Sequence, residues 1–157
     1  MVYIIEDNTV IWTRDIYNKY TFHEDAFISF HECKKEIDEN LSNGVVMPRV
    51  NVEMGDRYFK IMHEDKFVGE LIVYHWADEN YDEVSVFVFD EYANNKFGTK
   101  AMQQYIAKFH DRNHGLLVRV DTTNRLRLKI DAMLTNMDFF YDENMEGYIY
   151  NGLLDEK

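Results

Sequence analysis

The sequence has little cysteine, proline or glycine, and each shortage excludes a class of protein. Of its 157 residues, one is cysteine, one is proline and seven are glycine. A lone cysteine excludes an intramolecular disulfide framework, and we expect Cys33 to be a buried thiol. The scarcity of glycine and proline excludes collagen-like and linker-built chains. Because 46% of the residues are hydrophobic and 15% aromatic, we expect residues 1–157 to form one ordered domain.

The sequence also lacks long hydrophobic runs. No segment approaches the roughly 20 apolar residues that cross a bilayer. The first seven residues, Met-Val-Tyr-Ile-Ile-Glu-Asp, have neither the basic region nor the apolar run of a signal peptide. We therefore expect a cytoplasmic protein that does not contact a membrane.

Positive charge is the third shortage. Seventeen basic residues stand against 29 acidic ones, which gives a net charge of −12. Such a charge is unfavourable for binding phosphate backbones, so we expect no nucleic-acid partner. The segment between Asn94 and Ile130 is an exception, with eight basic and two acidic residues. These basic residues form either solvated helix faces or a pocket for a small polyanion.

The first part of the sequence predicts one strand and two helices. Val2–Glu6 is a short, mostly apolar segment typical of a strand. Trp12 and the two apolar residues that follow it at four-residue steps predict a helix. Thr21–Glu24 has capping-box spacing for a second helix, which Asn43–Gly44 would end.

The middle of the sequence predicts an antiparallel meander. Val50, Val52 and Met54 alternate with polar residues, which favours a first strand. Two further strands, Tyr58–Met62 and Phe67–Tyr74, flank a short polar turn. An acidic loop, 77–83, precedes the next strand. This strand is apolar almost throughout and should therefore be central in the sheet. That strand is Val84–Phe89.

The last third predicts a strand–helix–strand unit, a further helix and a hairpin. A polar loop follows the central strand, and a strand, loop, helix and strand in this order favour a parallel crossover. The expected elements are a helix with Ala101, Tyr105 and Phe109 on one face, a strand at Leu116–Val120, a helix at Leu126–Met137, and strands at Met137–Asp142 and Tyr148–Asn151.

This order of elements, together with the loop Asp90–Lys100, resembles the GNAT superfamily of N-acetyltransferases. The element order matches over nearly the whole chain, and the motifs match from Val84 to Phe139. In that family the loop carries Q/R-x-x-G-x-G/A, and its backbone N–H groups hold the pyrophosphate of acetyl-CoA. Ala93, Lys96 and Gly98 occupy the three motif positions here. Unpaired amides and the helix dipole favour an anion at such a helix start.

The resemblance implies a fold and a cofactor site. The fold is mixed α/β (α+β), with a central, mostly antiparallel sheet, a splayed parallel strand pair and helices on both faces. Acetyl-CoA would lie with its pyrophosphate at the helix start and its pantetheine along the central strand. A second family motif begins with an Asn four residues past a strand valine, as in Val120 to Asn124. The implied cofactor residues are Phe87, Val88, Asn95, Lys96, Phe97, Gly98, Thr99, Lys100, Asn124 and Arg127.

Amine acetylation needs a base that takes a proton from the acceptor ammonium. Glu83, at the entry of the central strand, is the first candidate, and Glu70 and His75 on the neighbouring strand are the next. Leu134 stands where the family frequently has a general-acid tyrosine, so Tyr141 or water would protonate the thiolate of CoA. We interpret the acidic residues 78, 79, 82 and 83 either as a solvated loop or as an attractor for a cationic acceptor.

We expect no metal site. His110 and His114 have the i, i+4 spacing of two ligands on a helix, but no glutamate follows the first in an H-E-x-x-H pattern. A histidine near a helix C-terminus is explained by the helix dipole.

The sequence thus predicts an acetyl-CoA-dependent N-acetyltransferase that acts on a small-molecule or peptide amine by direct transfer. The alternative is a catalytically silent GNAT-fold protein that binds acyl-CoA or a protein partner, which the replaced motif positions favour. The aromatic residues of the last two strands would pack in the hairpin and core or form the edge of a homodimer.

Overall fold

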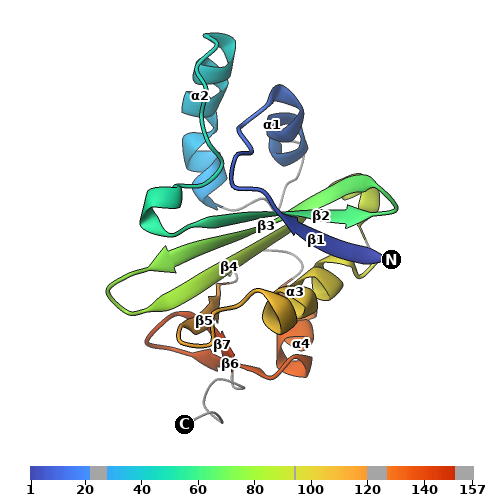
Figure 1. Ribbon diagram of the computed structural model, residues 1–157, viewed down its shortest axis with the longest axis vertical. Helices are drawn as coiled ribbons and strands as arrows, with labels where there is room; N and C mark the ends of the chain where they lie inside the picture. The colour runs from blue at the N-terminus through green and yellow to red at the C-terminus, as the bar shows by residue number, and fades with distance from the viewer. Residues whose placement is uncertain (22–27, 94, 120–126, 151–157) are drawn as a thin grey trace.

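The computed structural model describes residues 1–21, 28–93, 95–119 and 127–150, with residues 28–32 and 127–128 described by their backbone only. Its centre is a seven-stranded sheet with the order β1-β2-β3-β4-β5-β7-β6 (Figure 1). Only β4 and β5 are parallel neighbours, and the other adjacent pairs are antiparallel. The strands are β1 (Val2–Glu6), β2 (Arg57–His63), β3 (Lys66–Trp76), β4 (Tyr81–Val88), β5 (Gly115–Val118), β6 (Phe139–Asp142) and β7 (Gly147–Tyr150).

Helices cover both faces of the sheet. In Figure 1, α1 and α2 lie on one side of it, and α3 and α4 on the other. The α-helices are α1 (Arg14–Thr21), α2 (Ile28–Ser42), α3 (Phe97–Lys108) and α4 (Arg127–Asn136), and two short 3-10 helices are η1 (Val52–Met54) and η2 (Asp90–Tyr92).

Alternation along β4 divides the core into two layers. Val84 packs with Ala101 and Tyr105 of α3 in the larger hydrophobic cluster. Phe87 packs with Ile16 and other residues of α1 in a smaller cluster. Because neighbouring side chains of a strand point to opposite faces, β4 is buried on both sides. The prediction that this strand is central in the sheet is confirmed.

The parallel pairing of β4 with β5 is short. It joins Tyr81 to Gly115, Asp82 to Leu116 and Glu83 to Leu117, and β5 ends one residue later at Val118. On its other side β4 is paired with β3 along its whole length. The second half of β4 therefore has no partner in β5, and the predicted splayed parallel pair is confirmed.

The predicted order of elements is confirmed, but one expected strand is wrong. Residues 52–54 form η1 and not a strand. The carbonyl oxygen of Asn51 accepts hydrogen bonds from the amides of Met54 and Asp56, and Gly55 takes a left-handed φ of 89°. These bonds close the segment into a turn, so the alternation of Val52 and Met54, which are both exposed, does not reflect burial.

Cys33 is also placed differently from the prediction, because it is exposed on α2. Helix α2 makes few contacts with the rest of the described chain, so its residues after position 32 are half-buried or exposed. The expected end of this helix is confirmed, since α2 ends at Ser42 and Gly44 has a φ of 73°. The expected capping box extends beyond residue 21, outside the described residues.

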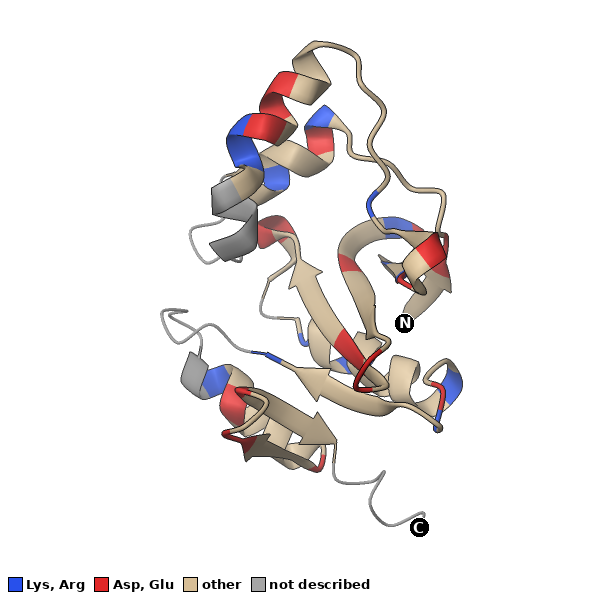
Figure 2. Cartoon of the chain, turned by 90° about the vertical axis from the view of Figure 1, so that its left-hand side faces the viewer, with Lys and Arg blue, Asp and Glu red and all other residues tan. Residues whose placement is uncertain are grey.

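Charged side chains are concentrated on helices and loops. Figure 2 shows acidic and basic residues mixed along α1 and α2, whereas the strands are mostly uncharged. Among the described helices none is long and apolar enough to span a bilayer.

Candidate active site

The start of α3 lies against the unpaired half of β4. Gly98 is in the first turn of α3, and a Cβ built on it would lie 3.4 Å from a methyl group of Val86 and 3.6 Å from one of Val88. Lys96 precedes the helix with a φ of 61°, and its side chain forms no capping hydrogen bond. The first amides of α3 therefore lack a side-chain cap from this position, which suits an anion.

The conformation of Lys96 gives a physical meaning to the motif position that it occupies. A φ near 60° is the left-handed region, which glycine enters without steric cost. The GNAT motif has glycine at this position, and the backbone of the present chain keeps the same kind of conformation with a lysine. Lys96 and Lys100 are both exposed. The side-chain amide of Asn95 stabilises the turn by donating hydrogen bonds to the carbonyl oxygens of Tyr92 and Ala93.

The second half of β4 is paired with β3 but not with β5, so its main-chain groups on the β5 side are not part of the parallel ladder. Phe87 directs its ring toward α1, where the ring centroid lies 4.2 Å from that of Tyr20. Val88 packs on the opposite face of the sheet, in the larger hydrophobic cluster with residues of α3. On the β3 side, a Cβ at Gly69 would lie 2.5 Å from the carbonyl oxygen of Phe87, so glycine permits the close approach of β3. Main-chain groups are thus what this part of β4 offers to a ligand.

Glu83 lies at the last parallel pair, where β4 and β5 part. It is half-buried and shares the face of Phe87, with Tyr74 of β3 as its cross-strand neighbour. Burial raises the pKa of Glu83 above its ordinary value of 4.5, while the charge of Arg119 and a hydrogen bond from Trp76 oppose the rise. A carboxylate with a raised pKa is a stronger base than an exposed one.

Two neighbours of Glu83, Trp76 and Arg119, were not predicted from the sequence. The guanidinium carbon of Arg119 lies 4.5 Å from the centre of the Trp76 ring, so Arg119, just after β5, meets the end of β3. Alternation could have placed Trp76 on the face of Tyr74. The approach of Arg119 depends on the register of β5, which no local pattern shows.

Glu70 lies on the same face but has no exposed surface. Its carboxylate accepts hydrogen bonds from Arg49, at 2.7 and 3.1 Å, and from the hydroxyls of Tyr20 and Tyr58. Burial raises the pKa of both hydroxyls, so they remain protonated donors. The guanidinium of Arg49 also stacks on Trp12 at 3.9 Å. Glu70 is thus fully engaged in a buried network that ties α1 to the sheet.

His75 and Tyr141 lie apart from Glu83. His75 is on the opposite face of the sheet, where its Nδ1 is 2.8 Å from a carboxylate oxygen of Asp82. Tyr141 is on the edge strand β6, which β5 and β7 separate from β4, and its side chain is exposed. Leu134 is buried in the larger hydrophobic cluster. The structure thus does not bring the candidate acid Tyr141 close to β4.

Two predicted cofactor residues cannot be placed in the same way. Asn124 lies outside the described residues. Arg127 is the first residue of α4, and only its backbone is described.

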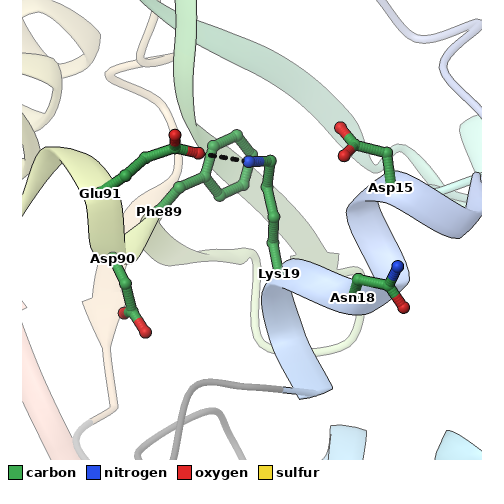
Figure 3. Close-up of a pocket in the computed structure, with 6 residues that line it drawn as sticks. All are labelled: Asp15, Asn18, Lys19, Phe89, Asp90 and Glu91. Carbon is green, nitrogen blue, oxygen red and sulfur yellow. Dashed lines mark hydrogen bonds and ion pairs between the residues drawn. The ribbon is translucent and has the colours of Figure 1, made fainter.

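A surface hollow of about 290 Å³ lies between α1 and the end of β4 (Figure 3). Three carboxylates and one ammonium line it, together with an aromatic ring. The Nζ atom of Lys19 is 2.5 Å from a carboxylate oxygen of Glu91 and 4.7 Å from the centre of the Phe89 ring. The hollow therefore has a net negative charge and a site where an ammonium rests on an aromatic face. Its lining residues are Asp15, Asn18, Lys19, Phe89, Asp90 and Glu91.

Comparison with known proteins identifies the fold. No protein-family model and no curated protein matches the sequence. Among solved structures, a GNAT-family acetyltransferase of Staphylococcus aureus superposes with a TM-score of 0.54 at 16% identity, over 93% of this chain and 89% of that one. Mutant forms of the spermidine/spermine N-acetyltransferase of Vibrio cholerae match with a TM-score of 0.54 at 11% identity, over 100% and 99% of the two chains.

A further match is a spermidine N-acetyltransferase of Vibrio cholerae in complex with CoA and spermine. It has a TM-score of 0.53 and 13% identity, over 90% of this chain and 82% of that one. The chain therefore has the GNAT acetyltransferase fold, as the sequence resemblance predicts.

Proposed function

We propose that this protein is an acetyl-CoA-dependent N-acetyltransferase that transfers the acetyl group directly to an amine. One observation carries the proposal: a half-buried carboxylate, Glu83, lies at the last parallel pair of β4 and β5, and the start of α3, which Lys96 does not cap, lies against the second half of β4, which is not paired with β5. The GNAT fold supports the reaction class. The local geometry supports a base, the Glu83 carboxylate, and a phosphate site, the amides at the start of α3.

The residues present fit acetyl-CoA. The amides of Phe97, Gly98 and Thr99 would hold the pyrophosphate, since the amide of Lys100 donates to the carbonyl oxygen of Lys96, and the exposed ammonium groups of Lys96 and Lys100 would add positive charge. The backbone of Phe87 and Val88 would bind the pantetheine. Because a strand rises about 3.3 Å per residue, the path from Val88 to Glu83 is roughly 16 Å, comparable to an extended pantetheine arm.

Glu83 would act as the general base. The acceptor must lose a proton before its nitrogen attacks the thioester carbonyl carbon, and the Glu83 carboxylate takes that proton directly or through one water. The new C–N bond forms as the C–S bond breaks, and the thiolate leaves with the sulfur electron pair. Since Leu134 has no ionisable group and Tyr141 is separated from β4 by β5 and β7, we assign the protonation of the thiolate to water.

The acceptor that suits this surface carries positive charge. The chain has a net charge of −12, and in the hollow beside α1 the carboxylates of Asp15, Asp90 and Glu91 outnumber the ammonium of Lys19. Asp82, one of the four acidic residues considered as an attractor, is buried against histidines and is not available for this role. Spermine, which is bound in one of the structurally similar proteins, is therefore a reasonable first probe.

The test is the release of free thiol from acetyl-CoA in the presence of spermine or a lysine-containing peptide. Glu83→Gln keeps the shape of the side chain and removes its basicity, so turnover should fall by roughly 10²–10⁴ while acetyl-CoA affinity stays nearly unchanged. Glu143→Gln, in the exposed turn between β6 and β7, is the matched control and should keep full activity.

The pH profile separates a base from a structural residue. In the wild type, kcat/KM should rise with pH through the pKa of Glu83, which lies above 4.5, and this rising limb should be lost in Glu83→Gln. Full activity of Glu83→Gln between about pH 6 and 9 would exclude Glu83 as the base. Binding of acetyl-CoA without turnover of any amine would favour the catalytically silent alternative, and absence of binding at millimolar ligand would contradict both.

A further inference from the structure

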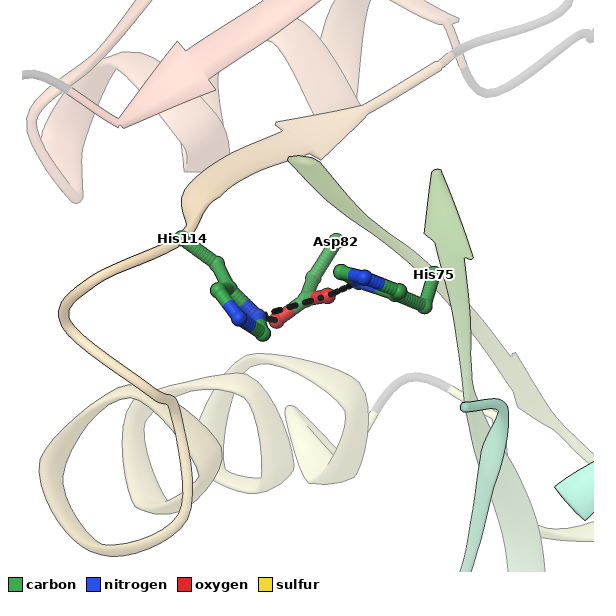
Figure 4. A group of neighbouring side chains, drawn as sticks. All are labelled: His75, Asp82 and His114. Carbon is green, nitrogen blue, oxygen red and sulfur yellow. Dashed lines mark hydrogen bonds and ion pairs between the residues drawn. The ribbon is translucent and has the colours of Figure 1, made fainter. Parts of the chain in front are cut away.

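Two histidines and one aspartate meet on the α3 face of the sheet, at the end of β4 remote from Gly98. His75 Nδ1 lies 2.8 Å from Asp82 Oδ1, and His114 Nδ1 lies 3.1 Å from Asp82 Oδ2 (Figure 4). One potential ligand atom from each of the three residues lies within 4.8 Å of the other two. We refer to His75, Asp82 and His114 as the His–Asp cluster.

Three separate segments supply the His–Asp cluster. His75 of β3 and Asp82 of β4 are directly opposed cross-strand partners. His114 immediately precedes β5, whose first residue pairs with Tyr81. The cluster thus lies beside the three parallel pairs that hold β4 and β5 together. It is separate from the proposed base, because Glu83 points to the other face of β4.

The spacing of the cluster fits a tetrahedral metal ion. With metal–ligand bonds of about 2.0–2.2 Å, two ligand atoms on a tetrahedron lie about 3.3–3.6 Å apart. The contacts between the carboxylate of Asp82 and the two imidazoles are 2.8 and 3.1 Å, so small side-chain rotations would admit an ion. Asp82 is buried, whereas the side chains of His75 and His114 are 20% and 27% exposed, which leaves an entry from solvent.

Each ring nitrogen of His114 has a carboxylate beside it, so either nitrogen can carry the ring proton. Its Nε2 lies 3.5 Å from a carboxylate oxygen of Asp111. The shorter contact places a proton on Nδ1 toward Asp82, and coordination of an ion through Nδ1 would leave the ring proton on Nε2, where the carboxylate of Asp111 accepts it. Histidine ligands in metal sites commonly have such a carboxylate or carbonyl partner on the second nitrogen.

His110 holds the backbone of this site and is not one of its ligands. Its Nε2–H donates to the carbonyl oxygen of His114 at 3.1 Å, and its Nδ1 lies 3.7 Å from Asp82 Oδ2, farther than the Nδ1 atoms of His75 and His114. With the proton on Nε2, Nδ1 accepts from the hydroxyl of Tyr105 at 3.4 Å. This network fixes the segment from which His114 projects.

We propose that His75, Asp82 and His114 bind one zinc ion, with water in the fourth position. Two imidazole nitrogens and one carboxylate are a typical Zn²⁺ ligand set, whereas Mg²⁺ and Ca²⁺ prefer oxygen ligands only. This proposal departs from our sequence-based expectation of no metal. The bound ion would join β3, β4 and the segment before β5, and so reinforce the closed end of the splayed strand pair.

The test is zinc binding to the whole chain after removal of metal with a chelator. Calorimetry with ZnCl₂ should show one ion per chain in the wild type. His75→Gln and His114→Gln should each weaken binding by at least roughly tenfold, the loss that follows even from removing a residue that only orients a ligand. His63→Gln is the matched control, because His63 lies on β2 outside the cluster, and it should bind zinc like the wild type. MgCl₂ should give no comparable binding.

A spectroscopic measurement distinguishes coordination from a general effect on folding. Long-range ¹H–¹⁵N spectra of the imidazole rings should show zinc-dependent shifts at Nδ1 of His75 and His114 and none at His63. The proposal is overturned if the wild type binds no zinc, or if His114→Gln and Asp82→Asn both bind it like the wild type, since zinc would then be held elsewhere. If Asp82→Asn does not fold, His114→Gln decides alone, because the side chain of His114 is only partly buried. Zinc binding like that of the wild type in His114→Gln then overturns the proposal.

Discussion

Glu70 and Glu83 show how the surroundings of one residue type decide its role. Both lie on the α1 face of neighbouring strands. Glu70 is completely buried and paired with Arg49, so it would reach an acceptor only if that ion pair opened. Glu83 is half-buried at the last parallel pair of β4 and β5. A buried carboxylate that loses its partner is costly, which assigns Glu70 to structure and leaves Glu83 as the chemical candidate.

Lys96 is a second residue whose role follows from its backbone. A non-glycine residue in the left-handed region costs roughly 1–2 kcal/mol. Lys96→Gly should therefore leave the free energy of unfolding unchanged or raise it by up to about 1 kcal/mol, since relief of strain exceeds the roughly 0.5–1 kcal/mol that glycine usually costs. Urea unfolding followed by circular dichroism measures the change.

The control for Lys96→Gly is Lys100→Gly, an exposed position inside α3. There glycine should lower the free energy of unfolding by about 1 kcal/mol, the ordinary helix penalty. An equal loss in both variants would show that Lys96 is not strained.

At the scale of elements, the contact between α3 and β4 places the proposed phosphate site. The amide of Gly98 is one of the uncapped donors of the first helical turn. Gly98→Pro removes this donor in the first helical turn, where no intrahelical hydrogen bond is lost, so acetyl-CoA binding should weaken by about tenfold or more, because a hydrogen bond to a charged group contributes roughly 1.5–3 kcal/mol. Calorimetric titration with acetyl-CoA gives the affinity.

Three further variants make this measurement specific. Gly98→Ala keeps the amide, and its Cβ would make only ordinary contacts with Val86 and Val88, so binding should be retained. Gly98→Val adds two methyl groups at the same contact and should weaken binding more than Lys96→Ala does. If Lys96→Ala proves the most damaging change, side-chain charge and not the main chain holds the phosphates.

For the whole molecule, the excess of negative charge is the dominant electrostatic feature. A net charge of −12 on 157 residues opposes the compact state through self-repulsion, which dissolved salt screens. Raising NaCl from about 20 to about 500 mM should therefore raise the Tm by a few degrees, since about 1 kcal/mol shifts the Tm of a chain of this size by roughly 2–4 °C. Differential scanning calorimetry tests this expectation.

The buried Arg49–Glu70 pair should contribute little to the salt effect, because its side chains are almost inaccessible to ions. Exposed pairs such as Arg14–Asp38 would be weakened by salt, but each contributes only about 0–1 kcal/mol. A Tm that falls as NaCl is added would show that specific surface pairs outweigh the general repulsion.

The sequence by itself determined the order of the elements and the central place of β4. Helix and strand periods are local, and an uninterrupted apolar strand needs cover on both faces, so residues 84–89 could be placed without a structure. The same reasoning failed at 52–54. Alternation of apolar and polar residues cannot distinguish a strand from a turn whose amides, those of Met54 and Asp56, donate to the carbonyl oxygen of Asn51.

Only the tertiary structure decided which side chains meet. Burial raises the pKa of Glu83, and the opposing charge of Arg119 is close only because the register of β5 brings that residue to the end of β3. The His–Asp cluster joins residues up to 39 positions apart in the sequence, since His75 and His114 come together only when β5 pairs with the start of β4. Strand register and parallel neighbours arise from long-range packing, and no local pattern of residue types carries that information.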